Sequence, residues 1–301
     1  MATLYTQVSS NKAKSMLYLA LFVGLIAALG YFASYYFNTY WIFPAALAIS
    51  VAMSFSSYWF SDKIALGVSR AKEIKKADNP YVYRMVENLA ITAGLPMPRV
   101  YVIDDTATNA FATGRDPKHA AIAVTTGIVD KLNNEELEGV LAHELSHIGN
   151  YDTRLMTIVV VLVGLVTLMT DFMLRLAFFG GGDRRESGQL GLVIMVAGFV
   201  LLLLSPIFAT LIQLAVSRKR EFAADASGAL LTRYPDGLAS ALEKISGDHE
   251  PLEVANKATA HLYIANPFKD RKKDGQSWFA GLFNTHPPIP QRVKALREMS
   301  V

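Results

Sequence analysis

The sequence predicts a mainly α-helical membrane protein with an α+β domain outside the bilayer. Of its 301 residues, 52% are hydrophobic and only 18% are charged, whereas soluble proteins contain about 25% charged residues. Long uncharged apolar runs alternate with polar stretches, and one polar stretch shows both strand-like and helix-like patterns. The apolar excess therefore indicates helices in lipid, and the mixed stretch indicates a domain in water.

Composition also excludes several classes of site and partner. The chain has no cysteine, so it can form neither a disulfide nor a thiolate zinc site, and it has no cysteine nucleophile. Its net charge is only +3, and its basic residues lie beside apolar segments instead of among aromatic ones. The sequence therefore predicts no nucleic-acid partner.

Residues 1–61 are predicted to form a transmembrane helical hairpin. The runs 16–36 and 41–60 carry no charge, and each is long enough to cross a bilayer. A buried pair of soluble helices is the alternative, while a signal peptide fits less well because the first run is too long and a second follows. Aromatic residues lie near the ends of both runs, as membrane interfaces favour: Tyr35, Tyr36, Tyr40, Trp41, Tyr58 and Trp59.

The basic residues predict the orientation of this hairpin. Lys12 and Lys14 precede it, and several lysines and arginines between Lys63 and Arg84 follow it. Because positive charge accumulates on the cytoplasmic side of a membrane, both ends of the hairpin should lie in the cytoplasm. We therefore expect a multi-pass protein of the cell (plasma or inner) membrane, with its polar domain and both termini cytoplasmic.

Residues 62–154 are predicted to form the first part of the polar domain. A helical period covers 81–93 and stops at a glycine and two prolines, and a strand rich in β-branched residues follows at 99–104. Two further strands, 109–114 and 120–125, are separated by a turn-forming stretch. This mixture of elements is typical of an α+β unit.

A helix with a metal-binding pattern ends this unit. In NNEELEGVLAHELSH, either Asn133 or Asn134 can cap the helix. His143 and His147 are four residues apart, so both imidazoles lie on one helix face and can bind one metal ion. Glu144 lies about 100° around that helix, within reach of a water beside the metal. The five-residue pattern also occurs by chance, so its interpretation depends on the rest of the chain.

Residues 155–216 are predicted to form a second transmembrane hairpin. The apolar segments 156–179 and 190–216 are each long enough to span, although Asp171 and Arg175 interrupt the first of them. Four spans are favoured over two spans plus an embedded helical pair. Either number is even, so the chain returns to the side of the membrane on which it left.

Residues 217–301 are predicted to complete the polar domain and to supply a third metal ligand. Without cysteine this ligand must be His, Glu or Asp, and Glu221 lies just past the last apolar segment. Asp225 follows one turn later and could accept the second N–H of a ligand histidine. The alternative is that both acidic residues, flanked by arginines, lie on an ordinary solvated helix face.

The motifs in this order resemble the HtpX family of membrane-bound zinc endopeptidases, relatives of the CAAX prenyl proteases. They are TNAFATG, HELSHIGNYD, two apolar segments, REFAADASGA and NTHPPIPQR, preceded by paired N-terminal spans. The resemblance covers nearly the whole chain. It implies a zincin-like (gluzincin) cytosolic catalytic domain and four transmembrane helices.

The resemblance also implies roles for particular residues. It makes His143, His147 and Glu221 the ligands of one Zn²⁺ per chain and Glu144 the catalytic carboxylate, and it supports Asp225 beside a ligand histidine.

The resemblance further marks a strand on which an extended substrate would add as another strand. Without the resemblance, a plain strand and turn would be the preferred interpretation of this stretch. The residues of this edge strand are Asn109, Ala110, Phe111, Ala112, Thr113 and Gly114.

His286 matches the His-Pro motif of the same family. It could face the zinc as an oxyanion partner, with Arg292 supporting it, or it could be a structural histidine in a proline-stiffened turn.

The expected function is zinc-dependent hydrolysis of peptide bonds in membrane or misfolded proteins. A role in membrane protein quality control and stress response comes from the resemblance alone, and the sequence indicates no oligomeric state. A membrane-anchored chaperone with a structural metal is one alternative, which the glutamate beside the first ligand argues against. A transporter is another, but its apolar segments hold few ionisable residues. A prenyl-protein protease is a third, although four apolar segments are few for enclosing a lipid-bearing substrate.

Overall fold

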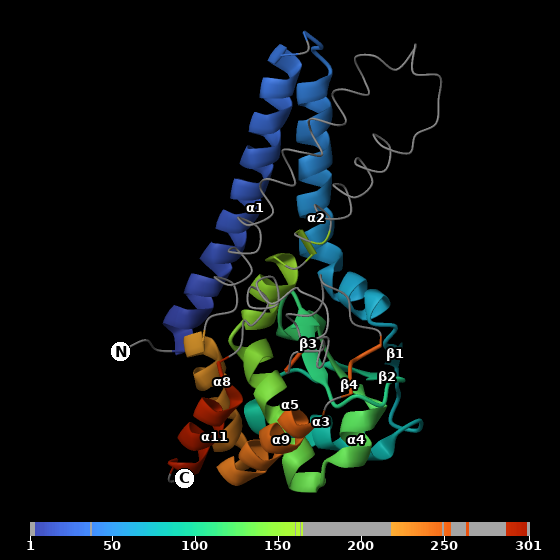
Figure 1. Cartoon of the computed structure of the whole chain (residues 1–301), viewed down its shortest axis with the longest axis vertical. Coiled ribbons are helices and arrows are strands. Elements are labelled where there is room, and N and C mark those ends of the chain that lie inside the picture. Colours follow the sequence, from blue (N-terminus) through green and yellow to red (C-terminus); the bar gives the residue numbers. More distant parts are fainter. Residues whose placement is uncertain are drawn as a thin grey trace.

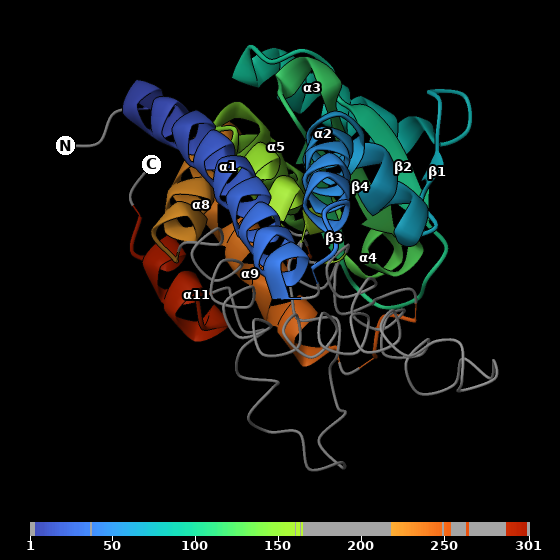
Figure 2. The ribbon, with the colours of Figure 1, turned by 90° about the horizontal axis from the view of Figure 1, so that it is seen from above.

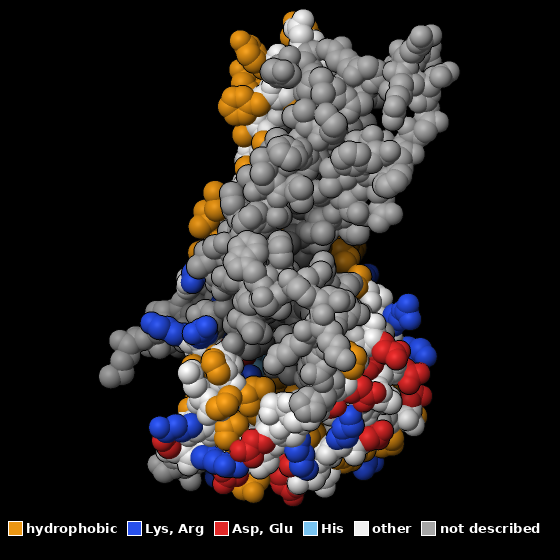
Figure 3. Space-filling view, viewed as in Figure 1, with side chains coloured by type: hydrophobic (Ala, Val, Ile, Leu, Met, Phe, Trp, Pro, Cys, Tyr) orange, Lys and Arg blue, Asp and Glu red, His pale blue; other side chains and the backbone are white. Residues whose placement is uncertain are grey.

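The structure is a computed structural model. It describes the following parts of the chain: residues 4–36, 38–159, 161–162, 164, 218–248, 250–253, 263–264 and 287–299. Figure 1 shows two long helices, α1 (Leu4–Tyr36) and α2 (Ile42–Val68), standing side by side on a domain that holds the other labelled elements. Hydrophobic side chains line the visible part of α1, and charged side chains gather on the domain (Figure 3).

The α1–α2 pair has the properties of a membrane hairpin. Both helices contain a stretch long and apolar enough to cross a bilayer, Val8–Tyr35 and Ile42–Val68, and in their most apolar parts only 17% and 11% of the residues are buried. Large apolar side chains such as Phe32 remain exposed. A buried pair of soluble helices would hide these side chains, so lipid is the environment that they fit.

Both helices extend beyond their predicted apolar runs. α1 begins at Leu4, and its polar part lies on the domain, where Asn11 and Ser15 are buried. α2 continues to Val68 and buries Asp62, Ala65 and Leu66 at its C-terminal end. The ends of both hairpin helices therefore pack against the domain, in addition to the covalent connection of α2 to it.

The third apolar segment begins by packing against this hairpin. Residues 152–159 are helical, and Ile158 and Leu162 share an apolar cluster with Phe22 and Ile26 of α1. Ser57 of α2 donates a hydrogen bond to the carbonyl oxygen of Ile158 at 3.0 Å. Residues 165–217, with Asp171, Arg175 and the fourth segment, lie outside the described residues, so the count of four spans stays a prediction.

The domain contains a four-stranded sheet in the order β1-β2-β4-β3. β2 (Arg99–Ile103) and β4 (Ala120–Thr125) are parallel, and β3 (Ala110–Gly114) is antiparallel to β4. These three strands confirm the sequence prediction. β1 (Lys72–Glu73) was not predicted, because two exposed charged residues show no apolar alternation.

Helices cover this sheet and enclose the main core. α5 is central: it contacts β3, β4, α3, α8 and α9, and Figure 2 shows it between β4 and α8. The helices α3 and α5 confirm the helical stretches predicted for the first part of the domain, whereas the short α4, η1 and the C-terminal α11 were not predicted. The helices have these bounds: α3 Pro80–Ala93, η1 Pro117–His119, α4 Thr126–Lys131, α5 Asn134–Gly149, α8 Arg218–Thr232, α9 Pro235–Gly247 and α11 Ile289–Arg297.

Candidate active site

The helix with the metal-binding pattern begins at a capping box. Asn133, not Asn134, is the cap: its Oδ1 accepts from the backbone N–H of Glu136 at 2.9 Å, and the Glu136 carboxylate accepts from the Asn133 N–H at 2.9 Å. From this start α5 runs through the core as far as Gly149. His143 and His147 are 1% and 5% exposed on its face toward α8.

Glycines allow the neighbouring helices to approach α5 closely. A Cβ on Gly228 of α8 would lie 3.0 Å from the backbone nitrogen of His143. A Cβ on Gly139 of α5 would lie 2.8 Å from the backbone nitrogen of Leu238 in α9. Glu221 precedes Gly228 by seven residues, so both lie on the same face of α8. The close contact therefore brings the Glu221 carboxylate to the histidines.

The three predicted ligand side chains converge in the core. The Nε2 atoms of His143 and His147 are 3.2 Å apart, and Glu221 oxygens lie 3.8 Å and 3.5 Å from them, respectively. All three ligand atoms lie within 4.8 Å of one another. Tetrahedral ligands at zinc distances of about 2.0–2.2 Å are about 3.3–3.6 Å apart. The donor set and its spacing therefore fit a zinc ion.

The outer nitrogens of both histidines contact carboxylates. His143 Nδ1 lies 2.9 Å from an Asp225 oxygen, and His147 Nδ1 lies 3.1 Å from an Asp152 oxygen. An Nδ1–H donated to each carboxylate leaves the Nε2 lone pair directed into the cluster. Asp225 was singled out in the sequence for this contact, and Asp152 was not. Its signal was its place as the last residue of HELSHIGNYD, beyond a sharp turn at Tyr151 (φ 60°).

Arg292 of α11 joins the cluster through Asp225. It is fully buried, its Nε and Nη2 donate to the two Asp225 oxygens at 2.9 and 2.6 Å, and its Nη1 lies 3.8 Å from a Glu221 oxygen. Burial alone would raise the pKa of Asp225, but the hydrogen bonds from His143 and Arg292 hold that pKa below its usual value. His286, which Arg292 was expected to support, lies outside the described residues.

The protein groups around His147 favour positive charge at the cluster. Burial alone would lower the pKa of His147, but its hydrogen bond with Asp152 and the charges of Glu221, Asp152 and Glu144 raise that pKa to about 9. Glu144 is 3% exposed, and its charge also raises the pKa of Arg292. A field that stabilises a proton here also attracts a metal cation.

The predicted substrate strand lies at the edge of the sheet, but part of that edge is covered. Because β3 pairs with β4 through alternate residues, Ala110, Ala112 and Gly114 direct their backbone polar groups to the outer edge. The Ala110 carbonyl accepts from the backbone N–H of Ile264 at 3.0 Å, and the Gly114 carbonyl accepts from Thr153 Oγ1 at 3.2 Å. Among the described residues, the edge thus already has partners on both sides of Ala112.

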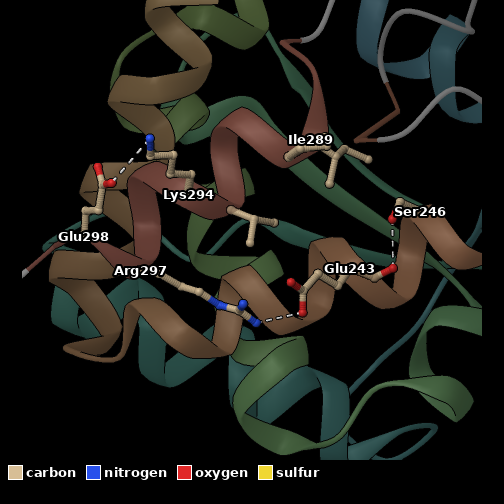
Figure 4. Close-up of a pocket in the computed structure, with 8 residues that line it drawn as sticks. Glu243, Ser246, Ile289, Lys294, Arg297 and Glu298 are labelled. Carbon is tan, nitrogen blue, oxygen red and sulfur yellow. Dashed lines mark hydrogen bonds and ion pairs between the residues drawn. The ribbon is translucent and has the colours of Figure 1, made fainter.

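An open groove of about 680 Å³ lies elsewhere, between α9 and α11 (Figure 4). Ile289 and Val293 contribute apolar lining, and Arg297 pairs with Glu243 at 2.8 Å beside it. Neither the histidines nor Glu221 line this groove. The predicted ligand residues therefore lie in the buried cluster and not in this groove.

Comparisons with known proteins show what the whole chain is similar to. Residues 76–300 match the profile of peptidase family M48. A protease HtpX homolog of Tropheryma whipplei (strain Twist) is 45% identical over 297 residues, covering 98% of each chain. One of Thermoanaerobacter pseudethanolicus is 42% identical over 303 residues, covering 99% of each. The crystal structure of S. mikatae Ste24p aligns with a TM-score of 0.47 and 20% identity, over 97% of this chain and 67% of that one. The chain therefore belongs to peptidase family M48 and is a membrane-bound metalloprotease.

Proposed function

We propose that the protein is a zinc-dependent endopeptidase that hydrolyses membrane or misfolded proteins at the cytoplasmic face of the cell membrane. One observation supports this most: three buried ligand atoms, from His143, His147 and Glu221, converge within 4.8 Å beside Glu144. A glutamate at that position has no use in a closed structural site. It does have a use in hydrolysis, so a protease is favoured over a chaperone with a structural metal.

His143 Nε2, His147 Nε2 and a Glu221 oxygen would hold the ion. Three protein ligands leave a fourth position, which is typical of catalytic sites. Zinc at such a site would supply a water with its pKa lowered to about 7 and would polarise the scissile carbonyl. Asp225 and Asp152 keep the two imidazoles in the tautomer that ligation requires.

Glu144 is the proposed general base and acid. Its carboxylate accepts a proton from the attacking water and then donates it to the leaving amine. Arg292, buried and charged, neutralises the Asp225 carboxylate and so limits the negative charge around Glu144. His286 remains a proposed partner of the developing oxyanion.

The proposed substrate position is the outer edge of β3 at Ala112. An extended substrate would form backbone hydrogen bonds with this edge. Such binding depends on the substrate's main chain more than on its side chains, which suits broad specificity. Pairing along the whole edge would require Ile264 to leave Ala110. Because α1 and α2 extend directly from the domain, the site would lie beside the bilayer, and exposed segments of membrane proteins would reach it. The proposed role in membrane protein quality control rests on the family alone.

The test is cleavage of a model membrane protein by the detergent-solubilised full-length chain. We expect cleavage that a chelator abolishes and added Zn²⁺ restores. Glu144→Gln should bind one zinc per chain, measured by metal analysis, and should cleave nothing, whereas His143→Ala should lose the metal. Glu138→Gln, the same change on the same helix, is the matched control and should cleave normally. Stoichiometric zinc with client binding and no cleavage would identify a chaperone instead.

A further inference from the structure

The N-terminal part of α1 reaches the surroundings of the predicted metal ligands through one amide side chain, that of Asn11. Asn11 is 3% exposed. Its Nδ2 donates to an Asp152 oxygen at 2.8 Å and to the Asn150 carbonyl at 3.0 Å. Its Oδ1 accepts from Arg220 Nη1 at 3.1 Å. A single side chain of the N-terminal helix thus bonds to the end of α5, to the segment after it and to α8.

Asp152 connects this amide to a proposed metal ligand. One Asp152 oxygen accepts from Asn11, and the other lies 3.1 Å from His147 Nδ1. Arg220 Nε lies 3.6 Å from the first oxygen, which is too long for a hydrogen bond but close enough for an ion pair. Asn11 is therefore two hydrogen bonds from the His147 ring.

The chemistry of the amide matches this position. Asp152 requires a donor and Arg220 requires an acceptor, and asparagine offers both on one short side chain. A polar side chain on a helix that enters the membrane is costly to bury unless its hydrogen bonds are made. Ser15, one turn later on α1, is also buried, but its hydroxyl donates to the Asn11 carbonyl within the same helix. Substitutions at Asn11 and Ser15 therefore distinguish an effect on the packing of α1 from an effect on Asp152.

We propose that Asn11 is a positioning residue for the metal site, which orients the Asp152 carboxylate and through it the imidazole of His147. The proposal rests on the proposed function, since it assumes that His147 binds zinc. It implies that the seating of the membrane helix α1 on the domain helps to set the affinity of the site for its metal. The N-terminal hairpin is then part of the catalytic unit as well as its anchor.

The experiment is a double-mutant cycle on zinc affinity, measured by chelator competition with the full-length protein in detergent. Asp152→Ala should raise the zinc Kd by about 10–100-fold, as for other partners of ligand histidines. Asn11→Ala should raise the Kd by about 3–10-fold, a smaller effect because it acts through Asp152. In the Asp152→Ala background, Asn11→Ala should change the Kd no further. Ser15→Ala should leave the Kd unchanged, and excess zinc should restore cleavage by Asn11→Ala.

Two outcomes would overturn the proposal. One is an unchanged zinc Kd in Asn11→Ala, and the other is the same fold-change in both backgrounds, which would indicate a general effect on folding. If Asp152→Ala fails to fold, Asp152→Leu serves as the second background, because it fills the space and can accept no hydrogen bond from Asn11. The proposed function fails separately, through a wild-type protein that binds no zinc.

Discussion

Gly228 of α8 and His143 of α5 are in backbone contact: a Cβ added to the glycine would lie 3.0 Å from the histidine nitrogen and 3.2 Å from its Cα. This contact determines how far Glu221, two turns earlier on α8, is from the histidines. Gly228→Ala should therefore push α8 outward, destabilise the protein by about 1–3 kcal/mol and weaken zinc binding. Thermal unfolding and chelator competition measure the two effects.

The control for this substitution is Gly247→Ala. Gly247 is at the end of α9, and a Cβ there meets nothing within 4 Å. That variant should keep both the stability and the zinc affinity of the wild type. Equal zinc affinity in the two alanine variants would show that the spacing of α5 and α8 does not control the site.

Arg292 should contribute far more stability than Arg297 on the same helix. Arg292→Ala removes the two hydrogen bonds that the buried carboxylate of Asp225 accepts from this arginine, and breaking such a buried pair costs about 3–5 kcal/mol. Arg297 pairs with Glu243, and both side chains are about half exposed, so Arg297→Ala should cost less than about 1 kcal/mol. Unfolding midpoints of the two variants give the comparison, and similar midpoints would contradict it.

Ala112→Pro tests the substrate position. Proline removes an N–H that points away from β4, which an edge strand tolerates, so the fold and zinc binding should persist. If substrates pair with this edge, kcat/KM should fall by roughly 10-fold, the equivalent of one lost hydrogen bond of about 1.4 kcal/mol. Ala112→Val keeps the N–H and serves as the control. A proline variant with normal kcat/KM would place the substrate elsewhere.

Asp248 should contribute to stability in a pH-dependent way. It follows α9 and accepts hydrogen bonds from Thr108 in the loop before β3. Burial alone would raise the pKa of Asp248, but hydrogen bonds from Thr108, Glu250 and Lys131 hold that pKa well below its usual value. A carboxyl whose pKa is lowered by folding stabilises the protein above its unfolded pKa of about 3.9 and loses that contribution as the pH falls further. The wild type should therefore be more stable than Asp248→Asn at pH 7. The difference in unfolding midpoint should shrink below about pH 4, and a difference that is constant with pH would contradict the assignment.

Much of the candidate site was predictable because it depends on local geometry. The four-residue spacing of His143 and His147 places both on one helix face whatever surrounds them. The same holds for Glu221 and Asp225 on α8. The strands 99–104, 109–114 and 120–125 were recognisable from β-branched residues and turn signals, and the structure has them within a residue of those bounds.

The sequence by itself determined which residues could bind a metal, on which helix faces they lie and that an apolar hairpin precedes them. Only the tertiary structure decided which distant residues support them. Asn11 contacts Asp152, 141 positions away, and Arg292 contacts Asp225, 67 positions away. The local sequence pattern of a helix or strand cannot predict contacts between such distant residues. The physical reason is that helix spacing is a property of the backbone, whereas these contacts depend on glycines that let α5, α8 and α9 approach and on the docking of α1 against them.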